Sequence, residues 1–195
     1  FPSTIYNFIM QKSTLETDFS YRLFGSEKSR LIDTKVSEKF ATPFLLMLRA
    51  AKAAKEFLDE AKADSVTIFI GKGNNGEDGL CLAALLKVDD VKTNVIDLCY
   101  KKRPETHAYR FCLDLGINIY KFNANKIPKA DWYIDAIFGI GLNRSLTGDY
   151  LKAVNFLQCS ETKKILSLDL PSGLHGSKGN IFNKLVRATS TISFL

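Results

Sequence analysis

Residues 66–70 read VTIFI, and the residues that follow, 71–79, read GKGNNGEDG. The first stretch is β-branched and aromatic and carries no charge, which is typical of a strand that a parallel sheet buries on both faces. The second stretch is a glycine-rich turn, and the apolar residues at positions 80–87 predict a helix after it. A strand, a turn and a helix in this order form the first unit of an α/β fold.

The same alternation continues on both sides of this unit. Upstream, apolar residues at steps of three and four predict an amphipathic helix over residues 44–61, which Pro43 separates from a shorter helix over residues 26–40. Downstream, the pattern predicts strands at residues 94–98, 117–122, 132–138, 164–168 and 189–194, and helices at residues 104–115 and 150–157. Strands that alternate with helices predict an α/β fold, with a doubly wound, mostly parallel sheet between two helical layers.

The composition excludes several classes of protein. The chain has 195 residues, which favours a single domain. No apolar run reaches the roughly 18 residues of a membrane-spanning helix, so we expect no membrane insertion. The 27 Lys and Arg residues exceed the 21 Asp and Glu residues, but they lie in short scattered groups, which disfavours a nucleic-acid partner. The 4 cysteines form neither a CxxC pair nor a zinc spacing, so we expect a reducing, cytoplasmic location.

The glycine-rich turn after the first strand fits several roles. Residues 71–76 match the pattern G-x-G-x-x-G, and Asp97 ends the next predicted strand, at about the distance of the ribose-binding acid in dinucleotide-binding proteins. Glu77 and Asp78, however, place two carboxylates in the first turn of the helix, where they repel a pyrophosphate. The turn therefore fits a structural role, a phosphate cradle, or a loop that binds a ligand through amides and carboxylates. It lacks the Gly-Lys-Ser/Thr ending of a P-loop.

Two further loops begin near an aspartate at the end of an apolar strand. Asp135 lies within WYIDAIF at residues 132–138, and Asp169 follows KILSL and begins the sequence DLPSG. A carboxylate in an apolar strand is costly to bury unless it is paired or binds a cation. Each aspartate also fits a simpler role as the cap of its turn. Because ligands of open α/β sheets bind outside the carboxyl ends of the strands, the three loops together form the candidate site.

One residue from each loop supplies an oxygen donor. Asn75, Asp135 and Ser172 provide an amide, a carboxylate and a hydroxyl oxygen, with no sulfur or imidazole beside them. Oxygen donors select a hard cation, and a single formal charge fits a weakly held monovalent ion. The two histidines, His107 and His175, lie in no nucleophile motif, which leaves little support for a catalytic triad.

The three loops, in this order and spacing, resemble those of the YjeF N-terminal domain family. GNNGEDG at residues 73–79 is similar to the family's GNNGGDG, DAIFGIGLNRSLTGDY at residues 135–150 to its second motif, and DLPSG at residues 169–173 to its third. The resemblance implies a Rossmann-like single domain of three α/β/α layers over residues 26–195. Residues 1–25 then form an N-terminal extension of unknown role.

Enzymatic members of this family are NAD(P)H-hydrate epimerases, which are isomerases of metabolite repair. The resemblance implies that this chain interconverts the R and S forms of hydrated NADH or NADPH, written NAD(P)HX below, so that a dehydratase can restore NAD(P)H. In many bacteria that dehydratase is fused downstream. Because TSTISFL at residues 189–195 ends without a turn, we expect the natural chain to continue. A homodimer through the N-terminal helices is also implied.

The family's site residues carry over to matching positions of this sequence. The implied cation is potassium, with Asn75, Asp135 and Ser172 as its ligands. Glu77 replaces a glycine of the family pattern, and His175 stands where the family has aspartate or asparagine. The implied substrate-binding residues are Asn74, Asn75, Gly76, Glu77, Asp78, Gly139, Ile140, Gly141, Leu142, Asn143, Arg144, Ser145 and Asp169.

The chemistry requires a group that moves a proton, and two aspartates are candidates. Asp169 is the first choice of catalytic acid and base, and Asp135 is the second, because a bound cation would hold Asp135 ionised. Two other functions stay open. One is a non-catalytic, dimerising or RNA-associated scaffold, as among the family's mRNA-decapping relatives, although these tend to lose the site residues that this chain keeps. The other is an NAD-dependent oxidoreductase, which fits G-x-G-x-x-G and Asp97 but lacks a hydride-transfer constellation.

Overall fold

The computed structural model describes residues 28, 31, 34–35, 42–159 and 164–194. Within them the chain forms a six-stranded sheet of order β3-β2-β1-β4-β5-β6, in which all neighbouring strands are parallel. The strands are β1 (Ser65–Ile70), β2 (Lys92–Asp97), β3 (Asn118–Lys121), β4 (Trp132–Ala136), β5 (Lys164–Leu168) and β6 (Ser190–Ile192). This is the strand order of doubly wound nucleotide-binding folds, and it confirms the Rossmann-like prediction.

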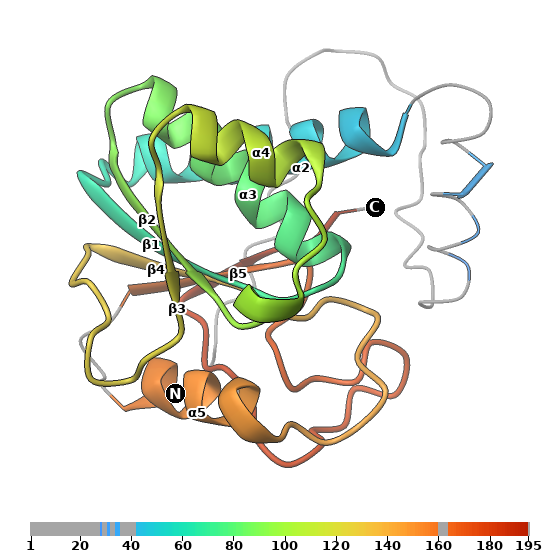
Figure 1. Cartoon of the computed structure of the whole chain (residues 1–195). Helices are drawn as coiled ribbons and strands as arrows, with labels where there is room; N and C mark the ends of the chain where they lie inside the picture. The colour runs from blue at the N-terminus through green and yellow to red at the C-terminus, as the bar shows by residue number, and fades with distance from the viewer. Residues whose placement is uncertain (1–27, 29–30, 32–33, 36–41, 160–163, 195) are drawn as a thin grey trace.

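Helices cover both faces of the sheet and give the molecule three layers (Figure 1). One face carries α2 (Pro43–Glu60), α3 (Asn74–Val88) and α4 (His107–Asp114), and the other carries α5 (Gly148–Gln158). A short 3-10 helix, η1 (Tyr100–Lys102), follows β2. Two separate clusters of buried apolar side chains, one on each side of the sheet, form the core.

The sequence of β1 explains why it lies at the centre of the sheet. Ile68 and Ile70 pack into the cluster beneath α2 and α3, whereas Phe69 packs into the cluster beneath α5. All three side chains have no exposed surface. A strand that is buried on both faces has no need of a polar side, which accounts for its uncharged sequence.

The helix after β1 begins earlier than the sequence predicted. The pattern predicted a turn over residues 71–79, but α3 starts at Asn74, with Gly73 as its N-cap. Packing explains the difference, because the glycines in this segment permit close contact with the sheet. A Cβ atom on Gly79 would lie only 2.7 Å from the Cβ atom of Ala136. The glycines that looked like turn residues therefore let the first turns of α3 lie against β4.

The helix predicted over residues 26–40 and the N-terminal extension lie largely outside the described residues. The adjoining helix was predicted correctly: α2 begins after Thr42, whose hydroxyl oxygen accepts a hydrogen bond from the N–H group of Leu45 at 3.4 Å. Pro43 occupies its first turn, where no backbone donor is needed. In the described part of the chain, no helix combines the length and apolarity that a bilayer crossing requires.

Candidate functional site

The candidate site lies at the carboxyl edge of the sheet, where β1, β4 and β5 end next to one another. The strand order reverses direction between β1 and β4, and ligands of doubly wound sheets bind at this point because the loops diverge there. Three loops leave this edge, at residues 71–73, 137–147 and 169–189. They contain the three sequence motifs, so the fold places all three motifs at one edge.

Asp135 is the most buried acid of this edge. It lies in β4, has no exposed surface, and receives four hydrogen bonds. The Ser172 hydroxyl donates to Oδ1 at 2.6 Å, and the Ser172 N–H group donates to Oδ2 at 2.8 Å. The Ser167 hydroxyl and the Ile137 N–H group complete the set at 2.9 Å and 3.3 Å. The structure therefore joins two of the three predicted cation ligands directly.

Burial makes the negative charge of Asp135 expensive. Loss of hydration raises the pKa of its carboxyl, and the hydrogen bonds from Ser172 and Ser167 oppose that rise. Among the described residues, Asp135 forms no salt bridge with a basic side chain. A cation beside this carboxylate would offset the cost of its burial.

Asn75 supplies the observation that points most directly to a ligand. It lies in the first turn of α3 with 7% of its surface exposed. Its Nδ2 atom donates to the carbonyl oxygen of Leu168 at 3.2 Å, which ties α3 to the end of β5. Its Oδ1 atom is buried and, in the described structure, has no hydrogen-bond partner. Because buried acceptors are nearly always satisfied, an orphaned amide oxygen indicates that something binds there.

These observations fit a monovalent cation. The donor set is an amide oxygen, a carboxylate and a hydroxyl, all oxygen, as a hard cation requires. Among the described residues there is no group of three or more His, Cys, Asp or Glu side chains that could hold a metal ion. The role of Asn75, Asp135 and Ser172 as cation ligands stays a prediction.

Asp169 joins the second loop to the third. It directly follows β5 with a backbone φ of 64°, a left-handed conformation that costs a residue other than glycine about 1–2 kcal/mol. Its Oδ2 atom accepts a hydrogen bond from the Ile140 N–H group at 2.8 Å. A Cβ atom on Gly139 would lie 2.1 Å from the same oxygen. Backbone strain at an acid that is held against a neighbouring loop is a feature of functional sites.

The rest of the second loop divides into exposed and buried residues. Gly141, Asn143, Arg144 and Ser145 are exposed at the carboxyl edge, whereas Leu142 is buried in the core on the α5 side. The loop is held by a residue that the sequence analysis missed. Asn183 accepts a hydrogen bond from the N–H group of Leu146 at 2.9 Å and donates to its carbonyl oxygen at 3.0 Å. An isolated asparagine outside the motifs gives no signal of this role.

A buried arginine organises the first loop, and the sequence analysis missed it as well. Arg103 follows η1, and its Nε atom donates to Asp97 Oδ2 at 2.7 Å. Its Nη1 atom donates to Glu77 Oε1 at 3.2 Å. The other oxygen of Glu77 accepts a hydrogen bond from the Thr106 hydroxyl at 2.5 Å. Glu77 thus neither faces solvent nor projects toward a ligand, and its predicted contact with substrate stays a prediction that this geometry does not favour.

The same network bears on the oxidoreductase alternative. Asp97 is 1% exposed, and its carboxylate also accepts a hydrogen bond from the N–H group of Cys99 at 2.7 Å. A ribose-binding acid must present its carboxylate to the ligand. Asp97 directs its carboxylate to Arg103 and to the backbone instead. The G-x-G-x-x-G pattern is therefore not accompanied by Asp97 as a ribose-binding acid.

His175 has a structural role in the third loop. Its ring stacks on Phe182 with 5.4 Å between the ring centroids. Its Nδ1 atom accepts hydrogen bonds from the N–H groups of Ser177 and Lys178 at 3.2 Å and 3.3 Å. These contacts shape the loop over residues 174–181 and explain how a histidine is accommodated at this position.

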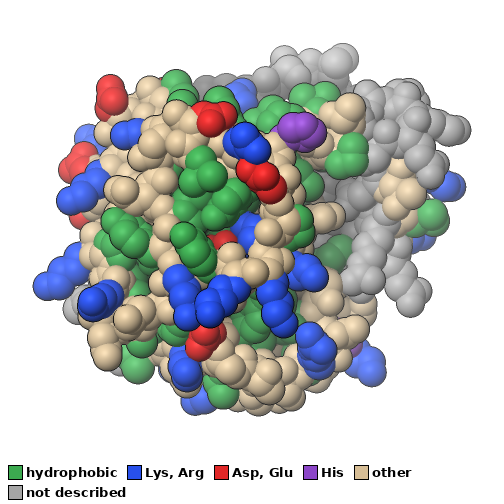
Figure 2. All heavy atoms as spheres, in the orientation of Figure 1, with side chains coloured by type: hydrophobic (Ala, Val, Ile, Leu, Met, Phe, Trp, Pro, Cys, Tyr) green, Lys and Arg blue, Asp and Glu red, His purple; other side chains and the backbone are tan. Residues whose placement is uncertain are grey.

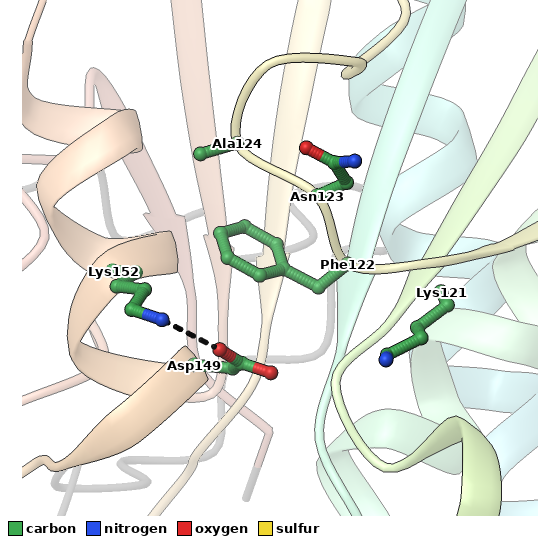
Figure 3. Close-up of a pocket in the computed structure, with 6 residues that line it drawn as sticks. All are labelled: Lys121, Phe122, Asn123, Ala124, Asp149 and Lys152. Atoms are coloured by element: carbon green, nitrogen blue, oxygen red, sulfur yellow. Dashed lines mark hydrogen bonds and ion pairs between the residues drawn. The ribbon is translucent and has the colours of Figure 1, made fainter.

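A cavity of about 480 Å³ lies between the end of β3 and the first turns of α5. Lys121 and Lys152 extend toward each other from opposite sides of it, and Lys152 contacts Asp149 at 3.3 Å (Figure 3). The ring of Phe122 lies between them. Figure 2 shows several Lys and Arg side chains grouped on this face of the molecule. The cavity therefore has a basic rim that suits an anionic group.

Together, the fold and the edge define a Rossmann-like α/β domain with a candidate ligand site at its topological switch point. The particular family follows from comparison. A profile described as YjeF-related protein N-terminus matches residues 44–195, and the chain belongs to that family.

Named relatives match most of the chain, and a solved structure shares its fold. An NAD(P)H-hydrate epimerase of Lentilactobacillus buchneri is 32% identical over 172 residues, which cover 85% of this chain and 79% of that protein. A bifunctional NAD(P)H-hydrate repair enzyme of Dictyoglomus turgidum is 28% identical, covering 86% of this chain and 34% of that protein. The crystal structure of yeast ynu0 superposes with a TM-score of 0.73 at 21% identity, covering 87% of this chain and 79% of that one. The last comparison shows the common fold.

Proposed function

We propose that this chain is an NAD(P)H-hydrate epimerase, which interconverts the R and S forms of NAD(P)HX so that a dehydratase can restore NAD(P)H. Family membership and epimerase-named relatives that match most of the chain support this function. The observation that carries it is the orphaned Oδ1 atom of Asn75, at the edge that also holds buried Asp135 and the constrained Asp169. These groups support a ligand site at this edge.

The proposed reaction needs no redox step. The hydroxyl-bearing carbon of the substrate lies next to a ring nitrogen, so it is a hemiaminal centre. Its configuration inverts when the ring opens, or when water leaves and adds again from the other side. Ring opening needs a base that takes the hydroxyl proton as the carbonyl group forms and a proton that reaches the ring nitrogen as the C–N bond breaks, and ring closure reverses both transfers. Loss of water needs an acid that protonates the departing hydroxyl group, and addition from the other side needs a base that takes a proton from the incoming water. One positioned carboxyl group can serve as acid and base in turn.

Asp169 is the residue we propose for this proton transfer. Its Oδ2 atom accepts a hydrogen bond from the Ile140 N–H group at 2.8 Å, which holds the carboxyl group against the second loop at the carboxyl edge of the sheet. Asp135 is less suited, because its two oxygens receive four hydrogen bonds from Ser167, Ser172 and Ile137. We therefore keep Asp169 as the first choice and Asp135 as the second.

We propose potassium as the cation that Asn75, Asp135 and Ser172 hold. When bound, the ion supplies positive charge that stabilises the buried carboxylate and orders the oxygen-bearing groups around it. The protein residues do the rest: Asp135 aligns Ser172 through two hydrogen bonds, and the Ser172 Oγ atom accepts one from the Phe138 N–H group at 3.0 Å. These hydrogen bonds join the third loop, which carries Ser172, to the end of β4 and the start of the second loop.

We further propose that the basic cavity beside α5 takes a phosphate-bearing part of the substrate, with Lys121 and Lys152 as its cationic groups. A dehydratase is the functional partner, either separate or fused as in the bifunctional relative. A homodimer that forms through the N-terminal helices is proposed on the exposed apolar side chains of Phe44 and Leu45 at the start of α2. We propose a cytoplasmic location because the substrate is damaged NAD(P)H.

The test is an epimerisation assay. Purified protein is incubated with a single epimer of NADHX, and the appearance of the other epimer is followed by NMR against the spontaneous rate. The proposal predicts a large acceleration, which Asp169→Asn reduces by about 100-fold or more while the Ile140 N–H contact is preserved. A wild-type rate equal to the spontaneous rate on both NADHX and NADPHX would overturn the function. An unchanged rate in the variant would overturn the role of Asp169.

A further inference from the structure

Arg103 is a buried cation that lies over the Tyr109 ring of α4, at 5.9 Å from the ring centroid, and its hydrogen bonds lead toward the candidate site. Its side chain is 1% exposed, and it contacts Asp97 and Glu77, whose side chains are 0% and 11% exposed. Its Nη2 atom also donates to the carbonyl oxygen of Gly71, the first residue after β1. The planar guanidinium therefore holds the end of β2, the start of α3 and the loop between β1 and α3 at once. A lysine cannot reproduce this fork of donors.

Gly71 in turn contacts both segments that carry predicted cation ligands. A Cβ atom on Gly76, the neighbour of Asn75, would lie 2.1 Å from the carbonyl oxygen of Gly71. On its other side, a Cβ atom on Gly71 would lie 1.9 Å from the carbonyl oxygen of Ile137. Ile137 donates its N–H group to Asp135. A shift of Gly71 would therefore move the neighbours of Asn75 and Asp135 together.

Through Glu77, Arg103 also contacts the first turn of α3. It lies two residues after Asn75, in the first turn of α3, and its carboxylate is held by Arg103 and by the Thr106 hydroxyl. The family motif has a glycine at this position, which has no side chain to reach Arg103. In this chain the departure from the motif thus ties the start of α3 to the segment between η1 and α4.

We propose that Arg103 and Glu77 are positioning residues of the cation site, which set the placement of Asn75 and Asp135 through Gly71 and the first turn of α3. The proposal rests on the proposed function only for its activity readout. It goes beyond that function because it assigns the cation affinity to a charge network that itself contributes no ligand to the ion. Residues that hydrogen-bond a metal ligand directly typically change affinity by about 10–100-fold when they are altered, and Arg103 and Glu77 act one contact further away, so we expect the lower end of that range.

The experiment compares Arg103→Lys, Glu77→Gly and Glu77→Gln with the wild-type protein. Arg103→Lys keeps the charge opposite Asp97 but loses the fork, Glu77→Gly restores the family glycine, and Glu77→Gln keeps an acceptor for Arg103. The matched control is Arg110→Lys, because Arg110 forms an ion pair with Glu105 on the same segment with 61% and 59% of the side chains exposed. This pair is far too solvated to order the site.

Two readouts are measured for each variant. The first is the rise in unfolding temperature in KCl over tetramethylammonium chloride at equal ionic strength, which reports ion binding without catalysis. The second is the KCl concentration that gives half-maximal epimerisation. We expect Arg103→Lys and Glu77→Gly to need roughly 10-fold more KCl than the wild type, both for the same rise in unfolding temperature and for half-maximal epimerisation. At saturating KCl both variants should recover most of the wild-type kcat. The KCl requirement of Glu77→Gln should lie closer to that of the wild type.

Two results would overturn the proposal. One is a potassium response of Arg103→Lys and Glu77→Gly that equals that of the wild type and of Arg110→Lys. The other is an unfolding temperature that falls in both salts alike while the KCl requirement stays constant, because this is what a purely structural network predicts. A wild-type protein that binds potassium but shows no epimerisation contradicts the proposed function instead, and the thermal readout still decides this inference.

Discussion

Replacing Gly139 with alanine tests how closely the second loop holds Asp169. The new Cβ atom would lie 2.1 Å from Asp169 Oδ2 and 3.0 Å from its Cγ atom. An ordinary contact begins at 3.4 Å, so the loop and the carboxyl group must separate by about 1.3 Å. Gly139 does not have a positive φ, so alanine meets no backbone penalty there. The effect of the change is therefore steric.

The size of the effect follows from that displacement. A catalytic group that is misplaced by about 1 Å typically loses ~100-fold in rate. Overpacking of this kind lowers the free energy of unfolding by about 1–3 kcal/mol, which leaves most domains folded at room temperature. We therefore predict that Gly139→Ala lowers kcat for NAD(P)HX epimerisation by about 100-fold while the protein stays folded.

The assay combines epimerisation kinetics by NMR with thermal unfolding of the same samples. Gly176→Ala is the matched control, because its added Cβ atom would come no closer than 3.2 Å, to the flexible Cδ1 end of Leu170. It should keep kcat within about threefold, since this contact is tight but yielding. Wild-type kcat in folded Gly139→Ala would refute the reasoning, because an Asp169 carboxyl that tolerates this displacement is not positioned by the loop for proton transfer.

Three more predictions concern charge and burial. Burial raises the pKa of Asp135 in the folded state, so the folded protein binds that proton more tightly than the unfolded chain, and the Asp135 contribution to stability falls as pH rises above about 4. In potassium-free buffer the stability difference between wild type and Asp135→Asn should therefore shrink or reverse with rising pH. A pH-independent difference in unfolding midpoints would contradict this. Desolvation raises the pKa of the Cys81 and Cys112 thiols to about 12, so a thiol reagent at pH 8 should label exposed Cys159 first and reach the other two only on unfolding. Lys121→Ala should raise KM several-fold and leave kcat nearly unchanged, since it removes one positive charge from the cavity rim, and an unchanged KM would remove the cavity from the substrate site.

The order of strands and helices was predictable from the sequence, because uncharged strands such as β1 indicate burial on both faces of a parallel sheet, and helical patterns separate these strands. The start of α3 was not. Asn74, Gly76 and Gly79 have the composition of a turn, and only the close approach of β4 at Ala136 shows why glycine belongs in this helix. Local propensity was overruled there by packing between segments that lie far apart in the sequence.

The candidate site was predictable where a residue contradicted its surroundings. Asp135 is charged within an apolar strand, and this alone indicates a buried carboxylate with partners. Arg103 gives no such signal: it lies 26 residues from Glu77, beside two exposed lysines, and its burial arises only when β2 and α3 are assembled. The oxidoreductase alternative with Asp97 stayed open for the same reason, because a strand-ending motif does not show the ion pair of Asp97 with Arg103.

The most direct test of this account is to locate the cation. Thallium(I) replaces potassium in oxygen-lined sites and scatters X-rays anomalously, so a crystal grown in thallium acetate reports its position. We predict an anomalous peak that is ligated by Asn75 Oδ1, the Asp135 carboxylate and Ser172 Oγ, and that Asn75→Ala abolishes. A peak elsewhere, with these three oxygens unligated, would contradict it.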